Sequence, residues 1–208
     1  HRARIDTARK TPPPLLAPVH SRGEFKVRER ALDDWYIEPE WAVEGLLDVQ
    51  RFSGITWDPA CGSGTIPRVF ERRGHEALGT DIVDRGHQPV IVLHDFIAKQ
   101  QPWHMTPDNI VCNPPFDLAE PFLRMALAVA KHKIAFLLRL SWCEGIRRRW
   151  VWDETPLAAV HPFASRVSMP PGGRGIKAKG GAVAFAWFVW SHDHVGPPIV
   201  RRIERRAA

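Results

Sequence analysis

The stretch Ile55-Thr56-Trp57-Asp58-Pro59-Ala60-Cys61-Gly62-Ser63-Gly64 decides the fold of this chain. A short apolar run ends at Asp58, and a turn with two glycines follows it. Glycines let the backbone turn tightly out of a strand and approach a ligand without a Cβ in the way. Apolar residues with helical spacing come next, at Ile66, Val69 and Phe70. The segment therefore predicts a strand, a ligand-binding turn and a helix.

The acid before the glycine turn indicates which kind of ligand binds there. Enzymes that bind dinucleotides carry a third glycine and hold a pyrophosphate at the helix N-terminus. Here Pro67 stands at the position of that third glycine, and the carboxylate of Asp58 disfavours a phosphate. A carboxylate suits a ligand that bears a sulfonium and an ammonium group. The alternative for this segment is a plain turn between a strand and a helix.

The rest of the chain alternates short apolar runs with helical patterns. A helix is predicted over Glu40–Val49, after Pro39, and another around Phe122–Ala130. The predicted strands are Ile55–Asp58, Ala77–Asp81, Val90–Asp95, Asn109–Asn113, Ile134–Leu140, Leu157–Phe163 and Ala182–Trp190. The last two strands have no long helix between them. This order predicts an α/β fold, with a doubly wound, seven-stranded mixed sheet and flanking helices.

Acidic residues stand at the ends of three successive predicted strands. Asp81 follows Asp58 by 23 residues, a spacing at which a carboxylate accepts hydrogen bonds from both ribose hydroxyls of a bound nucleoside. Asp95 is placed to accept from an adenine amine, and Ile82 and Phe96 to sandwich the ring. Each acid alone could be a surface or capping residue. Ligands gather at the carboxyl ends of strands in such sheets, so together the acids predict a nucleoside site.

The tetrapeptide Asn113-Pro114-Pro115-Phe116 follows the predicted strand at Asn109. It presents a side-chain amide oxygen, a rigid backbone carbonyl and an aromatic face at one point. A planar exocyclic amine needs such partners to become a nucleophile. In isolation the same residues could form a proline turn after a strand.

These two motifs resemble those of the S-adenosylmethionine-dependent amino-methyltransferases, especially the small DNA adenine-N6 enzymes of phages and prophages. The resemblance covers residues 36 to about 190 and implies a Rossmann-like class I methyltransferase fold. Tyr36-Ile37-Glu38-Pro39 is similar to the family segment that holds the methionine end of the cofactor, although Glu38 stands where those enzymes generally carry Thr. The cofactor-binding residues so implied are Tyr36, Pro39, Asp58, Pro59, Ala60, Cys61, Gly62, Gly64, Asp81, Ile82, Asp95, Phe96 and Asn113.

The resemblance implies a catalytic role for Asn113, Pro114, Pro115 and Phe116. Asn113 Oδ1 and the Pro114 carbonyl are expected to accept the two hydrogens of an adenine N6 amine, so that its lone pair points at the methyl group. Pro114 and Pro115 restrict the backbone, and Phe116 can stack on the base. A base inside duplex DNA must be flipped out to reach such a pocket. No metal ion is needed.

Composition favours a nucleic-acid partner. The 208 residues carry a net charge of +6, and no stretch approaches the length of a membrane span. Residues 1–30 read as a basic arm, and residues 31–208 as one methyltransferase domain with a basic, glycine-rich loop at 164–181. In that loop we expect phosphate contacts from Arg166, Arg174, Lys177 and Lys179. Three cysteines without metal-ligand spacing indicate a reducing, cytoplasmic setting. The oligomeric state is not specified.

Three alternatives stay open for the function. Asn-Pro-Pro followed by an aromatic residue also serves enzymes that methylate adenine in RNA or the amide of a glutamine side chain. Glutamine enzymes more often end the motif in Tyr, and cytosine-N4 enzymes usually begin it with Ser. A reading of another class is a nucleic-acid-binding module that kept the fold and lost turnover; the intact Asp58, Asp81, Asp95 and Asn113 argue against it.

Overall fold

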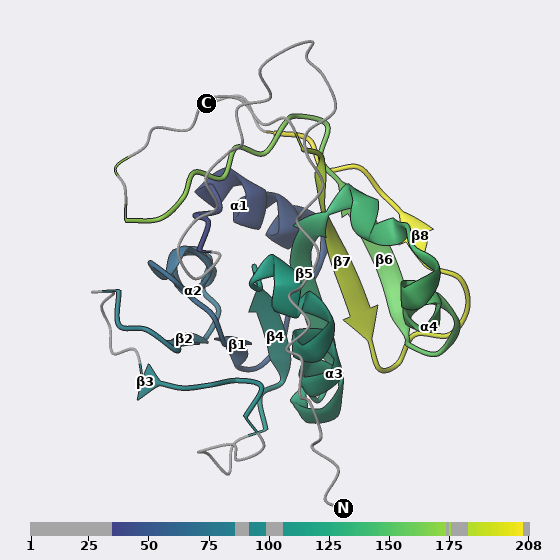
Figure 1. Ribbon diagram of the computed structural model, residues 1–208, viewed down its shortest axis with the longest axis horizontal. Coiled ribbons are helices and arrows are strands. Elements are labelled where there is room, and N and C mark those ends of the chain that lie inside the picture. Colours follow the sequence, from purple (N-terminus) through teal and green to yellow (C-terminus); the bar gives the residue numbers. More distant parts are fainter. Residues whose placement is uncertain (1–34, 86–91, 99–105, 174, 176–182, 206–208) are drawn as a thin grey trace, which may run out of the picture.

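The fold is built on one mixed sheet, seen in a computed structural model that describes residues 35–85, 92–98, 106–173, 175 and 183–205 (Figure 1). Its strands are β1 Thr56–Asp58, β2 Ala77–Asp81, β3 Val92–Leu93, β4 Asn109–Cys112, β5 Lys133–Arg139, β6 Leu157–Pro162, β7 Phe185–Ser191 and β8 Ile199–Val200. They lie in the order β3-β2-β1-β4-β5-β7-β6-β8. Only β7 runs antiparallel to its neighbours among these strands, because every other pairing is parallel.

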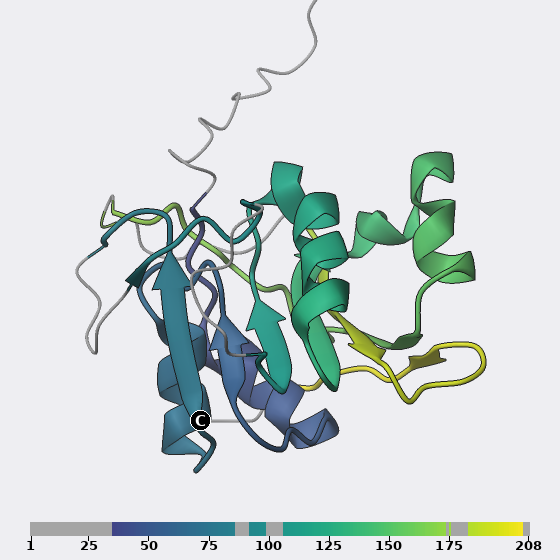
Figure 2. The ribbon, with the colours of Figure 1, turned by 90° about the horizontal axis from the view of Figure 1, so that it is seen from below.

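Helices cover both faces of the sheet, as Figures 1 and 2 show. The α-helices are α1 Glu40–Val49, α2 Thr65–Arg72, α3 Ala119–Val129 and α4 Arg149–Asp153, and the short 3₁₀ turns are η2 Phe116–Leu118, η3 Leu140–Cys143 and η4 Ile146–Arg148. Helices α1 and α2 pack on one face, whereas α3 and α4 pack on the other. This arrangement is the doubly wound architecture that the sequence predicts.

Strand β5 shows how the sequence builds two cores from one sheet. Ile134, Phe136 and Leu138 join the core under α3, and the alternate residues Ala135 and Leu137 join the core under α1 and α2. Successive side chains of a strand point to opposite faces. All five are fully buried or nearly so, which explains why this run is continuously apolar.

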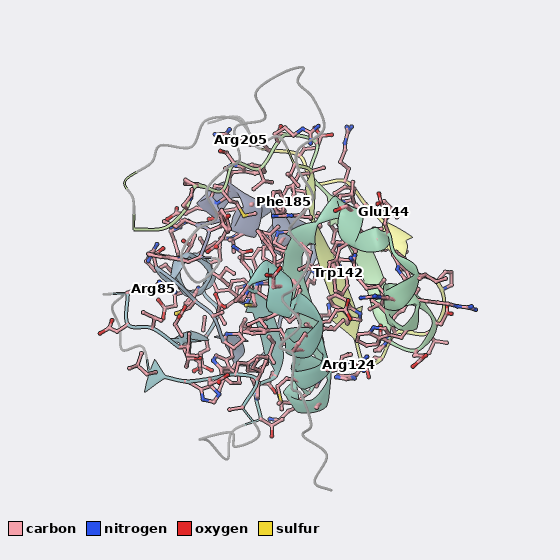
Figure 3. The ribbon with its side chains drawn as sticks, in the orientation of Figure 1. Arg85, Arg124, Trp142, Glu144, Phe185 and Arg205 are labelled. Atoms are coloured by element: carbon pink, nitrogen blue, oxygen red, sulfur yellow. The ribbon has the colours of Figure 1, made fainter. Side chains whose placement is uncertain are left out.

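Tryptophans tie the second half of the chain to the α3 face of the sheet. Trp142 on η3 lies edge-on to Trp190 of β7, with ring centroids 6.3 Å apart. The Arg124 guanidinium of α3 lies 3.9 Å from the ring centroid of Trp150 on α4 (Figure 3). The segment that follows β5 is therefore fastened to α3.

The predicted fold class is confirmed, with two additions. The helix Glu40–Val49 and the strand Ala77–Asp81 have the predicted bounds, and the other strands differ by a few residues at their ends. Among the described residues the sheet carries one strand more than the predicted seven. That strand, β8, has only two residues, too few to show an alternating pattern. The short helices between β5 and β6 were also missed, because a turn of three to five residues has no helical periodicity to read.

Some predictions fall outside the described residues. The basic arm at residues 1–30 does so entirely, and the glycine-rich loop does so at 174 and 176–181. Among the residues that the structure does describe, no helix is long and apolar enough to cross a membrane.

Gly79 on β2 lets the glycine turn lie close against the sheet. Gly79 pairs with Asp58 across the parallel β1–β2 ladder. A Cβ added to Gly79 would lie 2.8 Å from both Cβ and Sγ of Cys61, and 3.1 Å from Cγ of Pro67. Any side chain there must push the turn, or the first turn of α2, away from β2.

Substitution Gly79→Ala is expected to destabilise the protein by about 1–3 kcal/mol, because an added methyl group overpacks this contact. Urea denaturation measures the change. Cys61→Gly removes both clashing atoms, so the double variant should be more stable than the sum of the two single changes predicts. Simple additivity would show that Gly79 does not govern the position of the turn.

Candidate active site

One cavity brings the two sequence motifs together at the carboxyl ends of the parallel strands. Its wall includes residues of the glycine turn, of the ends of β2 and β3, and of the segment after β4. The predicted site residues on this wall are Tyr36, Pro59, Ala60, Cys61, Gly62, Asp81, Ile82, Asp95, Phe96, Asn113 and Pro115. Pro39, Asp58, Gly64, Pro114 and Phe116 were predicted too, but they do not contribute to the wall.

The glycine turn is held by the acid at the end of β2. Gly62 and Gly64 have φ of 53° and 75°, a left-handed conformation that glycine adopts readily. The Gly62 N–H donates to Asp81 Oδ2 at 2.8 Å, and the Val83 N–H donates to Asp81 Oδ1 at 3.0 Å. Asp81 thus fixes the turn against β2. Its predicted contact with ribose hydroxyls stays a prediction.

An apolar compartment lies at the β3 end of the cavity. Phe96 is buried and stands edge-on to Trp57 at 5.2 Å, while Ile82, 60% exposed, contributes to the wall at the end of β2. His94, also on the wall, stacks on Trp57 at 5.7 Å between centroids. These flat and branched side chains suit a planar heterocycle.

Trp35 forms the rim of the cavity over the glycine turn. A Cβ on Gly62 would lie 2.5 Å from Trp35 Nε1, and one on Gly172 would lie 2.2 Å from the indole ring. The guanidinium of Arg85 lies 4.3 Å from the centroid of the same ring. Figure 3 shows Arg85 on the β2 side of the molecule. The indole therefore packs between two glycines that leave it room.

The described part of the basic loop reaches this rim. The Ile37 N–H donates to the Pro170 carbonyl, and the Gly172 N–H to the Trp35 carbonyl, each at 3.0 Å. Arg166 is exposed, whereas Arg174, Lys177 and Lys179 lie outside the described residues. The loop thus starts its glycine-rich part beside the cavity.

Asn113 has a fixed orientation in the cavity. Its Nδ2 donates to the Tyr36 carbonyl at 3.0 Å and to Glu38 Oε2 at 3.1 Å. Two acceptors at one end of the amide identify that end as the nitrogen. Oδ1 is therefore the opposite atom, and it is buried without a hydrogen-bond partner among the residues that the structure describes. A buried, unpaired acceptor is costly and marks a place where a ligand can donate a hydrogen bond.

Buried acids lie next to this amide. Burial raises the pKa of Glu38 to about 7. Burial, and then the neighbouring Glu38 charge, raises the pKa of Asp58 well above its usual range. Asp58 Oδ1 accepts the Ala60 N–H at 3.2 Å, which places this carboxylate beneath the turn. A nearby positive charge would stabilise the ionised form of both acids, so this end of the cavity favours a cationic ligand.

Phe116 lies behind the wall and contacts other rings. It stacks on Tyr36 with centroids 5.5 Å apart and planes 27° apart, and the Arg139 guanidinium lies 4.6 Å from its centroid. The predicted stacking of Phe116 on a base stays a prediction.

Nine wall residues were not predicted as site residues. They are Trp35, Ile37, Glu38, Ser63, Arg85, His94, Ile97, Leu118 and Phe122, the last of which was expected only in the helix at Phe122–Ala130. Ser63, His94 and Ile97 stand within or beside the predicted motifs, so the neighbouring motif residues indicated that they lie near the site. Trp35 gave no such signal, because its position depends on the loop that returns after β6. Arg85 is placed by its contacts with Trp35 and Asp81.

No group of three or more potential metal ligands of the His, Cys, Asp and Glu types occurs among the described residues. No family model matches the sequence, and no curated protein matches it.

Solved structures with the same architecture include three from bacteria and archaea. A protein from Pyrococcus horikoshii, provisionally assigned as an RNA methyltransferase, is 14% identical with a TM-score of 0.51, over 73% of this chain and 79% of its own. A protein from Listeria monocytogenes, provisionally assigned as a class I S-adenosylmethionine-dependent methyltransferase, is 12% identical with a TM-score of 0.52. The match covers 79% of this chain and 62% of that one. A modification subunit of a provisionally assigned type I restriction enzyme from Vibrio vulnificus is 14% identical with a TM-score of 0.55. The match covers 85% of this chain and 48% of that one.

The chain has the class I methyltransferase fold. The match spans less than two thirds of the Listeria and Vibrio proteins, and identities of 12–14% carry the likeness of fold alone.

The raised pKa of Glu38 makes stability depend on pH. At pH below about 4.5 the carboxyl is protonated in both states, whereas above about 7 the folded protein must bury its charge. The free energy of unfolding is therefore expected to fall by about 3 kcal/mol as pH rises between these values. Urea denaturation of Glu38→Gln should lack the part of the loss that comes from Glu38 and keep the part that comes from Asp58, whose pKa burial also raises. Glu40→Gln, on the exposed start of α1, is the control and should keep the whole loss; equal slopes for all three proteins would contradict the assignment.

Proposed function

We propose that this protein transfers a methyl group from S-adenosylmethionine to the exocyclic N6 amine of adenine in DNA. The observation that carries the proposal concerns Oδ1 of Asn113, which is buried and has no partner in the described part of the chain, on the wall of the cavity that the glycine turn also forms. An acceptor of this kind recognises an N–H group. The cavity offers it at the carboxyl edge of the sheet, where ligands bind in such folds.

The residues of the cavity fit the proposed methyl donor. S-adenosylmethionine supplies an electrophilic methyl group on a sulfonium, and it also carries an ammonium group and an adenosine. The buried Glu38 and Asp58 suit the positive charges, and Gly62 lets the chain turn without a side chain in the way. Ile82 and Phe96 provide the apolar surfaces for the adenine ring.

Asn113 would hold the nucleophile and orient its lone pair. Oδ1 accepts one hydrogen of the amine, and acceptance of both hydrogens would favour a pyramidal nitrogen; the Pro114 carbonyl stays the predicted second acceptor, although Pro114 does not contribute to the wall. As the N–C bond forms, the C–S bond breaks, and the nitrogen then loses its extra proton to water. Orientation of two bound reactants contributes up to ~7–11 kcal/mol in favourable systems, so no metal ion is required for this step.

A nucleic acid is favoured as the polymer by the charge of the chain and by the position of the basic loop. The net charge is +6, and the loop that contains Arg174, Lys177 and Lys179 leaves the rim beside Trp35. Phosphate contacts from such a loop make binding depend on salt. Arg147 is exposed, while Arg148 donates to the Trp142 carbonyl and Arg149 pairs with Asp153, so this second basic run has fewer groups to offer.

RNA is the second candidate polymer. Of the similar folds, the Vibrio vulnificus protein is named as a modification subunit of a restriction enzyme, and the Pyrococcus horikoshii protein as an RNA methyltransferase. The first name agrees with DNA and the second with RNA. We favour DNA because the two motifs of this chain resemble the phage DNA enzymes.

The proposal is tested by incubating the protein with S-adenosylmethionine and separate pools of duplex DNA, single-stranded DNA, RNA and protein, followed by mass spectrometry. N6-methyl-2′-deoxyadenosine from DNA is the expected product. Asn113→Ala should lower the rate by at least about 100-fold, because it removes a pre-organised acceptor, while cofactor affinity measured by calorimetry changes only a few-fold.

Asn109→Ala is the matched control. Its amide donates to the Ser53 carbonyl at the opposite end of β4, away from the cavity, so the variant loses stability but keeps turnover at low temperature. Methylation of RNA or of a glutamine amide alone would replace the DNA assignment. Wild-type activity in Asn113→Ala would remove the mechanism.

A further inference from the structure

We propose that Glu38 is a positioning residue for the reaction: its carboxylate fixes the amide of Asn113 so that Oδ1 faces the substrate amine. This inference rests on the proposed function and adds to it a residue that holds the catalytic amide. The phage enzymes that the chain resembles generally carry Thr at this position, so the device belongs to this chain.

The geometry gives each hydrogen of the amide its own acceptor. Asn113 Nδ2 donates to the Tyr36 carbonyl at 3.0 Å and to Glu38 Oε2 at 3.1 Å. The terminal torsion of an asparagine has a broad, roughly two-fold preference, so only its partners select one orientation. A rotation by 180° would place Oδ1 against two oxygen acceptors. The carboxylate makes this rotated state much less favourable than a carbonyl alone does.

The effect of Glu38 depends on its proton. An ionised carboxylate only accepts hydrogen bonds and therefore holds the nitrogen end of the amide. A protonated carboxyl can donate to a rotated Oδ1, so it no longer selects the orientation. Because burial raises the pKa of Glu38 to about 7, the change occurs near neutral pH.

Glu38 is surrounded by groups from every element packed around it. Asp58, at the end of β1, is a second buried acid, whose pKa is raised by burial and then by the Glu38 charge, while the Thr65 hydroxyl and Arg68, both on α2, favour the ionised form of Glu38. The thiols of Cys61 and Cys112 interact with the Glu38 charge, and burial raises the pKa of both above the usual range, so neither ionises near pH 7. Glu38 is thus the group in direct contact with Asn113 that changes charge in this interval.

The first test reads the amide itself and needs no turnover. In ¹H–¹⁵N spectra of the full chain, the side-chain amide signals of Asn113, assigned by their loss in Asn113→Ser, should shift between pH 5.5 and 8.5 with a midpoint near 7. In Glu38→Gln the shift should disappear, because glutamine does not titrate. Signals that do not move, or that move equally in both proteins, would overturn the proposal.

The second test separates positioning from a purely structural role. In the wild type, kcat should rise with pH, at a midpoint below the value of about 7 in the ligand-free protein because the cationic donor favours the ionised carboxylate, whereas Glu38→Gln and Glu38→Thr should lack this rise. At pH 8 we expect kcat of Glu38→Gln to be about tenfold lower, the size expected when a charge-assisted hydrogen bond becomes a neutral one, with KM for DNA little changed. A wild-type profile in Glu38→Gln would overturn the proposal.

The two tests fail in different ways. If the wild type methylates none of the substrate pools, the proposed function is wrong, and the spectra still decide whether Glu38 orients Asn113. If methylation occurs and the spectra or the profile of Glu38→Gln match the wild type, only the positioning role is wrong.

Discussion

The parallel pairing of β1 with β4 is the constraint on which the site depends. Thr56 lies opposite Asn109 and Trp57 opposite Ile110, although 53 residues separate the members of each pair. Parallel neighbours end at the same edge of a sheet, so the glycine turn after β1 and the Asn-Pro-Pro-Phe segment after β4 must emerge side by side. Any reordering of the central strands would separate them. The shared cavity is therefore a consequence of strand order.

A second level of organisation comes from segments that cross this edge. Tyr36 and Glu38 approach the amide of Asn113 from before α1, and Pro170 returns after β6 to pair with Ile37. The same short segment therefore contacts the proposed catalytic amide and the basic loop. The position of the loop at the cavity and the orientation of the amide depend on one strip of backbone, which links polymer contact to chemistry in the proposed function.

Local patterns were enough to predict the sheet, because strands buried on both faces leave continuous apolar runs such as residues 134–138. They also predicted most of the wall, since motif residues at strand ends share an edge. The sequence pattern did not predict contacts between segments that lie far apart in the chain. Trp35 reaches the glycine turn only because Gly172 makes room for it, and nothing near Trp35 in the sequence signals that contact. The strand at Ile199 was missed because two residues show no period.

The most direct test of the shared site is a crystal structure with S-adenosylhomocysteine, the demethylated form of the proposed donor. The ligand should lie on the glycine turn, with its ring between Ile82 and Phe96 and its sulfur a few ångström from the side chain of Asn113. Binding elsewhere, or a sulfur that faces away from Asn113, would contradict the account.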